Sequence, residues 1–145
     1  MRILIQRVKS ASVTIDEKIY SSIAGGFLVL IGVKEGDTKE NADYLVKKLV
    51  NLRCFSDEAG KMNLNVKDVK GEILVVSQFT LSADFTKGNR PSFAKAGNPE
   101  VANELYEYFV SELRKHDIEI QTGQFAASME VGLINDGPVT FLIEK

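Results

Sequence analysis

The sequence has very few of the side chains that enzymes use as bases or metal ligands. It contains one histidine, His116, and one cysteine, Cys54, among 145 residues. A zinc site built from histidine and cysteine ligands is therefore excluded. A serine–histidine–aspartate triad would have to recruit His116, but this residue is expected at a helix C-terminus, where a positive side chain is favoured. A single cysteine forms no intramolecular disulfide, which fits a reducing cytosol.

Signals of cofactor binding and of membrane insertion are also missing. The chain has no Walker loop and no G-x-G-x-x-G fingerprint, and Gly25-Gly26 is more typical of a turn. The longest apolar run, Phe27 to Ile31, is too short to cross a membrane, and early charges argue against a signal peptide. We therefore expect a cytoplasmic protein that uses no metal and no cofactor and does not contact a membrane.

The amino-acid composition is that of an ordinary globular domain. Hydrophobic residues make up 44% and charged residues 26% of the chain, and the net charge is −2. A protein that coats nucleic acid is usually basic overall, so any contact with nucleic acid would need a local basic patch. The length fits one domain, which we place at residues 1–145.

Hydrophobic periodicity predicts seven or eight strands and two helices. A hairpin is expected at Asp16-Glu17. One helix is expected to have Asp37 as its N-cap, with Glu40 completing a capping box, and the other to have Asn98 as its cap and Pro99 at its first position. Residues 83–97 are expected to be mostly loop. After a β-rich start at residues 3–8, strands are expected near residues 12–15, 18–20, 27–33, 72–79, 118–122, 125–133 and 139–143, and a short eighth strand near 64–66. Together these strands and helices predict one α/β domain of α+β character, with a mixed, mostly antiparallel sheet or barrel and two main helices.

Two polar segments depart from this pattern. Ser77-Gln78-Phe79-Thr80-Leu81 follows an apolar strand directly, and a strand end delivers side chains to a fixed position on a rigid scaffold. The alternative is a polar strand exit with Phe79 in the core. The second segment is Asn135-Asp136-Gly137-Pro138-Val139-Thr140. Its asparagine, aspartate, glycine and proline are all common in turns, so it could be a surface turn between two strands.

Together the two segments resemble the two signature motifs of the D-aminoacyl-tRNA deacylase family. The resemblance extends to Met1-Arg2 with Gln6-Arg7-Val8, to Gly60-Lys61-Met62-Asn63 and to Gly88-Asn89-Arg90-Pro91-Ser92-Phe93. Five motifs in the same order cover nearly the whole chain. The resemblance implies a homodimeric hydrolase that acts on the 3′ end of charged tRNA. Each active site would receive the Gly-Pro segment, with a cis peptide bond, from the other subunit.

By this resemblance, Ser77, Gln78, Phe79 and Thr80 line the catalytic pocket, and Gly137 with Pro138 forms a chiral filter. An aminoacyl ester is already activated, so main-chain N–H groups near Phe79 and Thr80 and the ribose 2′-hydroxyl could suffice for hydrolysis. Thr80 could instead be a nucleophile, although no base is visible to activate it. A filter that excludes only L-side chains should also admit glycyl-tRNA.

Basic residues supply candidate contacts to the tRNA backbone. Arg2, Arg7 and Lys9 precede any acidic residue, and residues 83–97 add Lys87, Arg90 and Lys95 against a single acid, Asp84. Cations of this kind pair with phosphates without reading sequence. A solvated basic surface is the alternative for each of them.

Three other functions remain open from the sequence. The first is an editing domain of the same fold that removes an L-amino acid, against which the Gly-Pro motif argues. The second is a dimeric hydrolase or deaminase of small metabolites, and the third is a binding module without catalysis. Release of D-tyrosine and of L-tyrosine from tRNA would separate them.

Overall fold

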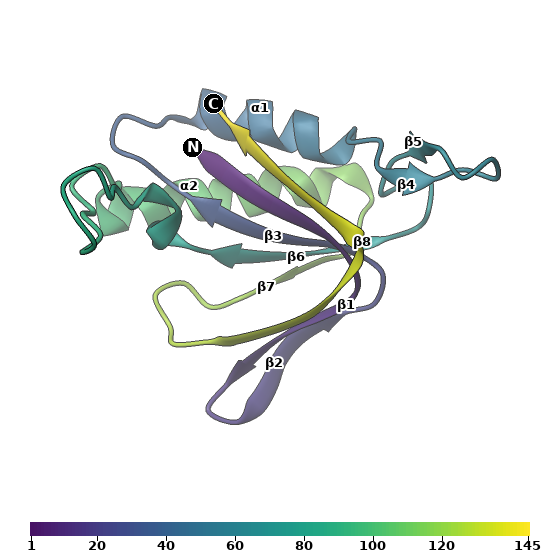
Figure 1. The fold of residues 1–145 in the computed structure, drawn as a ribbon, viewed down its shortest axis with the longest axis horizontal. Coiled ribbons are helices and arrows are strands. Elements are labelled where there is room, and N and C mark those ends of the chain that lie inside the picture. The colour runs from purple at the N-terminus through teal and green to yellow at the C-terminus, as the bar shows by residue number, and fades with distance from the viewer.

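Six strands form one curled sheet, and two helices cover one of its faces (Figure 1). The computed structural model describes residues 1–145. None of the helices has the length and apolar character needed to cross a membrane. In chain order the elements are β1 Arg2–Ile15, β2 Lys18–Ile23, β3 Gly26–Gly32, α1 Lys39–Val50, β4 Phe55–Ser56, β5 Met62–Leu64, β6 Glu72–Ser77, the 3-10 helix η1 Phe79–Ser82, α2 Pro99–Leu113, the 3-10 helix η2 Arg114–His116, β7 Ile120–Thr122 and β8 Glu130–Glu144.

The sheet is mixed and mostly antiparallel, as predicted. β1 pairs antiparallel with β2, β3 and β8. β6 lies parallel to both β3 and β7, and parallel neighbours need a long crossover connection. α1 lies in the crossover from β3 to β6, and α2 in the one from β6 to β7. Both helices therefore pack on the same face of the sheet (Figure 1).

Apolar side chains fill both faces of the central strands. Twenty-two buried residues form a core between the sheet and the two helices. Seven more, including Leu28 and Leu74, pack on the opposite face, inside the curl of the sheet. β3 is thus buried on both sides, which explains its unbroken apolar run. Each fully buried leucine, isoleucine or phenylalanine contributes about 1.5–3 kcal/mol relative to exposure.

The first helix begins one residue later than predicted. Thr38 is its N-cap, and Asn41 completes the capping box in place of Glu40. Asp37 has another role, because its carboxylate accepts a hydrogen bond from Lys34 N at 2.6 Å and pairs with the N-terminal ammonium of Met1. The prediction for Asp37 was wrong because this long-range pairing is invisible in the local pattern. The second helix begins at Asn98 and Pro99, as predicted.

The predicted break between two C-terminal strands is also wrong. Residues 130–144 form one strand, β8, whose pairing with β1 is irregular between Gln6 and Ser10. The segment with Gly137 and Pro138 is therefore a disturbance within a strand, not a surface turn between two strands. Residues 125–129 lie outside β8 and form a pocket wall instead.

Candidate active site

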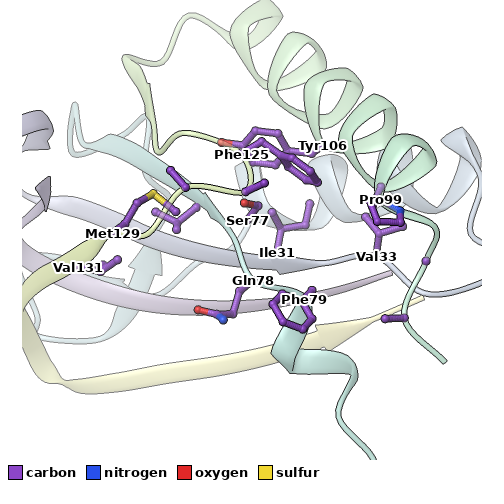
Figure 2. Close-up of a pocket in the computed structure, with 16 residues that line it drawn as sticks. Ile31, Val33, Ser77, Gln78, Phe79, Pro99, Tyr106, Phe125, Met129 and Val131 are labelled. Carbon is purple, nitrogen blue, oxygen red and sulfur yellow. The ribbon is translucent and has the colours of Figure 1, made fainter. Parts of the chain in front are cut away.

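A pocket of about 540 Å³ opens where β6 ends (Figure 2). The carboxyl ends of parallel strands are a common position for ligand sites, and here Ser77 of β6 lies beside Ile31 of β3. The start of α2 and the chain before β8 close the other sides. The lining residues are Ile31, Val33, Val76, Ser77, Gln78, Phe79, Ala96, Gly97, Pro99, Ala102, Tyr106, Phe125, Ala126, Ala127, Met129 and Val131.

Three of the four predicted catalytic positions line this pocket. Ser77, Gln78 and Phe79 do so, whereas Thr80 lies just outside the lining and is exposed. Phe79 is 60% exposed, so the alternative that places its ring in the core is wrong. Its ring packs against Phe93, with the centroids 5.0 Å apart. The strand end therefore presents this motif to the pocket and to solvent.

The main-chain N–H groups of Phe79 and Thr80 stand at the start of η1. The first N–H groups of such a helix find no partner inside it. No loop carbonyl or side chain accepts a hydrogen bond from the N–H of Phe79 or of Thr80. The Thr80 hydroxyl oxygen accepts a hydrogen bond from Gln78 Nε2 at 2.6 Å. No carboxylate or imidazole touches that hydroxyl.

The pocket lining contains no carboxylate, histidine, lysine, arginine or cysteine. Its one titratable group is the Tyr106 phenol, which donates hydrogen bonds to the carbonyls of Val75 at 3.1 Å and Gly123 at 3.5 Å. Burial raises the pKa of Tyr106 well above its usual value, so the phenol stays protonated. The walls of this pocket therefore supply no general base.

Several lining residues were missed by sequence reasoning. Tyr106 falls in the helix predicted to begin at Asn98-Pro99, Phe125 and Met129 fall in the strand expected near residues 125–133, and none of the three was given a role in the site. The two rings lie with their centroids 5.9 Å apart, and Met129 lines another part of the same pocket (Figure 2). No local signal distinguishes them from core residues, because elements far apart in the chain bring them together.

The segment at Gly137 and Pro138 is exposed and lines none of its own chain's pocket. Its peptide bond is cis, as the resemblance implies. The Asn135 side chain closes the segment from inside: its Oδ1 accepts from Val139 N at 2.8 Å, and its Nδ2 donates to Val139 O at 3.1 Å. Nδ2 also reaches Gln6 Oε1 at 3.1 Å. Both ends of the segment are thus fixed to each other and to β1.

Arg7 holds the same segment from the other side. It is only 9% exposed, and its Nε donates to Asp136 O at 2.8 Å. Another guanidinium nitrogen donates to the buried carbonyl of Cys54. Burial also raises the pKa of the Cys54 thiol to about 11, opposed in part by the Arg7 charge. A buried guanidinium that already donates to two main-chain carbonyls exposes few N–H groups to a tRNA phosphate. The structure therefore argues against that predicted role for Arg7.

The other predicted phosphate contacts lie at the surface. Arg2 is partly buried and is bound to Glu144 at 2.7 Å and to Leu81 O at 2.7 Å. Lys87 and Arg90 are exposed and form no ion pair. Lys95 pairs with Asp84 at 3.1 Å.

The chain is similar to known proteins over nearly its whole length. The family model described as D-Tyr-tRNA(Tyr) deacylase matches residues 4–144. The chain is 52% identical to a protein of Thermosipho melanesiensis over 100% of this chain and 97% of the relative. It is 54% identical to one of Geotalea daltonii, over 99% and 96%. Both relatives are named D-aminoacyl-tRNA deacylase.

Solved structures show the same fold. One, described as a c-Myc DNA unwinding element binding protein, superposes with a TM-score of 0.94 at 42% identity, covering 100% of this chain and 99% of the other. A second, described as a probable eukaryotic D-amino acid tRNA deacylase, has a TM-score of 0.83 at 16% identity, over 99% and 98%, and supports the fold alone. With a family model matched from residue 4 to residue 144 and relatives identical at half of all positions along their whole length, the chain belongs to the D-Tyr-tRNA(Tyr) deacylase family.

Proposed function

We propose that the protein is a hydrolase that cleaves the ester between a D-amino acid and the terminal ribose of tRNA, releasing the D-amino acid and free tRNA. The observation that carries this proposal is the pocket at the end of β6, which presents Ser77, Gln78 and Phe79 but no base. An activated ester is a substrate that such a site can hydrolyse, because it needs little beyond a placed water and a stabilised oxyanion.

The chemical step uses main-chain groups and the substrate itself. Water adds to the ester carbonyl, the carbon–oxygen bond to the ribose breaks, and the ribose oxygen takes up a proton. The free N–H groups of Phe79 and Thr80 stabilise the oxyanion, and the neighbouring 2′-hydroxyl positions the water. A covalent route through Thr80 is disfavoured, since its hydroxyl contacts an amide and no base.

The active form is a homodimer in which each pocket receives the Gly137–Pro138 segment of the partner. Two features support this proposal. The segment is exposed and remote from the lining of its own pocket. In addition, β8 pairs only with β1 and exposes Leu133, Ile134 and Leu142. An edge strand with exposed apolar side chains favours pairing with another copy.

Chiral selection comes from the main chain of that segment. Its carbonyls accept hydrogen bonds from the substrate ammonium group, which fixes the α-carbon. A D-side chain then points to open space, whereas an L-side chain meets the backbone. Each 1.4 kcal/mol of such overlap is about a tenfold loss of binding. Arg7 and Asn135 make the wall rigid. Glycyl-tRNA has no side chain to exclude and is also hydrolysed.

Cations around the pocket hold the tRNA. Arg2, Lys87 and Arg90 contact phosphates, whereas buried Arg7 does not. Weak binding to phosphates does not depend on the nucleotide sequence of the tRNA, which suits an enzyme that accepts different tRNAs.

The decisive assay offers D-tyrosyl-tRNA, L-tyrosyl-tRNA and glycyl-tRNA to the purified protein and follows release of each amino acid. We expect release from the D-tyrosyl and glycyl substrates and none from the L-tyrosyl substrate. Release of L-tyrosine would instead indicate an editing domain for L-amino acids. Tight binding of all three without release would indicate a binding module, and neither binding nor release would contradict the proposal.

A further inference from the structure

The 83–97 loop is held in one shape by its own contacts. Asp84 and Ser92 exchange two main-chain hydrogen bonds, each 2.9 Å long. The Asp84 carboxylate accepts from Thr86 N at 2.9 Å and from Lys95 Nζ at 3.1 Å. The hydrogen bonds from Thr86, together with Lys95, lower the pKa of Asp84 to about 2. The one acid of the loop is therefore ionised and engaged at neutral pH.

The tip of this loop carries an exposed aromatic ring that is followed in sequence by two cations without an ion pair. Phe85 is 61% exposed. Lys87 and Arg90 follow it, both exposed and without a carboxylate partner. Proteins commonly bind single-stranded nucleic acid through exposed aromatic rings beside cations, because the bases stack on the ring and the phosphates pair with the cations. Its sequence neighbours Asp84 and Thr86 are polar, and a single exposed ring is too small a surface for a stable protein interface.

The base of the loop is joined to the pocket. Ala96 and Gly97 belong to the pocket lining, and Phe93 packs against Phe79. From there the loop projects past the end of β6 (Figure 1). The loop therefore begins at the wall of the pocket.

We infer that the 83–97 loop binds the unpaired acceptor strand of tRNA as it leaves the pocket, with Phe85 stacking on one of its bases and Lys87 and Arg90 pairing with its phosphates. This inference rests on the proposed function and adds a recognition element to it. Stacking tolerates every base, so the loop secures the strand without selecting a tRNA by sequence.

The test compares Phe85→Ala with Phe85→Tyr, which keeps an aromatic ring, and with Tyr20→Ala, which removes another exposed ring at 52% exposure. Steady-state hydrolysis is measured on D-tyrosyl-tRNA and on D-tyrosyl adenosine, which lacks the acceptor strand. We expect Phe85→Ala to raise KM for the tRNA substrate roughly 5- to 10-fold with kcat unchanged, as loss of one stacked base would. Its kinetics on the adenosine ester should stay at the wild-type value, and both control variants should resemble wild type on both substrates.

A binding measurement keeps the inference testable without catalysis. The affinity of uncharged tRNA is measured by fluorescence anisotropy, with intact tRNA and with tRNA trimmed of its unpaired 3′ end. Phe85→Ala should weaken binding of intact tRNA only. The Lys87→Gln/Arg90→Gln variant should flatten the dependence of log Kd on log salt by about 1.4, the contribution of two single-strand phosphate contacts.

Different results would overturn different claims. An unchanged KM and Kd in Phe85→Ala, or an equal loss on the adenosine ester, would end the inference about the loop. A wild-type protein that hydrolyses no D-ester would end the proposed function, while the anisotropy measurement would still decide whether the loop binds the acceptor strand. Unfolding curves that match wild type exclude misfolding as the cause.

Discussion

Arg7 donates a hydrogen bond from Nε to the main-chain carbonyl of Asp136, 2.8 Å away, and so fixes the residue that precedes Gly137 to β1. The same guanidinium also serves the carbonyl of Cys54. One buried side chain thus connects three separate parts of the chain, one of which carries the proposed chiral filter.

Replacement of Arg7 should therefore damage both stability and selectivity. Arg7→Met leaves the buried carbonyl of Cys54 without a donor, which costs about 1–3 kcal/mol in the free energy of unfolding. The freed segment should also discriminate less between D- and L-tyrosyl-tRNA. Arg53→Met is the matched control, because Arg53 is exposed and bonds only Asn63. Urea unfolding and paired deacylation assays measure both effects; an Arg7→Met protein with wild-type selectivity would contradict the role of the anchor.

Gly137 should tolerate no side chain. A Cβ at this position would lie 2.5 Å from Val139 Cγ2 and 2.9 Å from Val139 N, at a φ of +148°. We expect Gly137→Ala to displace the segment and to abolish most D-tyrosyl-tRNA hydrolysis. Gly36→Ala is the comparison, since Gly36 also has a positive φ but nothing lies within 4 Å of its Cβ position. That change should cost about 1–2 kcal/mol of stability through the positive φ alone, and no activity. Equal activity of the two variants would refute the prediction.

The Thr80 hydroxyl should be dispensable for the chemical step. Its contact is the Gln78 amide, which cannot remove a proton from it. Thr80→Ala should keep kcat within about tenfold of wild type, equivalent to about 1.4 kcal/mol in the barrier. A tRNA whose terminal ribose lacks the 2′-hydroxyl should lose most of its reactivity with the wild-type enzyme. Complete inactivity of a folded Thr80→Ala protein that still binds tRNA would favour a covalent mechanism instead.

A charge on the exposed edge of β8 should separate the proposed dimer. Ile134 is 58% exposed on this strand, and Ile134→Lys would place an ammonium group in the interface between two copies. Sedimentation should then show a monomer, with deacylation lost because no partner segment reaches the pocket. Ile19→Lys alters an isoleucine that is 73% exposed on β2 and should leave the dimer and its activity intact. A wild-type monomer with full activity would disprove the shared site.

Stability should fall at alkaline pH because of Cys54. Burial raises the pKa of its thiol from 9.0 to about 11. The unfolded chain therefore loses this proton at lower pH than the folded protein does. The contribution of this thiol to the free energy of unfolding is fully present below pH 9 and is lost as the pH rises through 11, by about 3 kcal/mol in total. Cys54→Ala lacks this titration, so the difference in unfolding free energy between the two proteins should change over that range. A constant difference would mean that the folded thiol is not shifted.

The sequence predicted correctly those elements whose boundaries are set by their own residues or by immediate neighbours in the chain. The apolar run of β3, the turn at Asp16-Glu17 and the start of α2 at Asn98 are confirmed. The start of α1 was misplaced, because Asp37 is paired with the chain terminus. The unbroken β8 was missed for a similar reason: pairing with β1 carries the strand through residues that are common in turns.

The sequence by itself determined that a polar motif follows a buried strand, that the base and metal ligands of most hydrolases are scarce, and that the family resemblance spans the chain. These properties depend on residue identity and short spacing alone. Only the tertiary structure decided that Arg7 is a buried anchor, that Tyr106, Phe125 and Met129 share a pocket with Ser77, and that Gly137 and Pro138 lie outside that pocket. Such relations arise when packing brings distant segments together, and no local pattern encodes them.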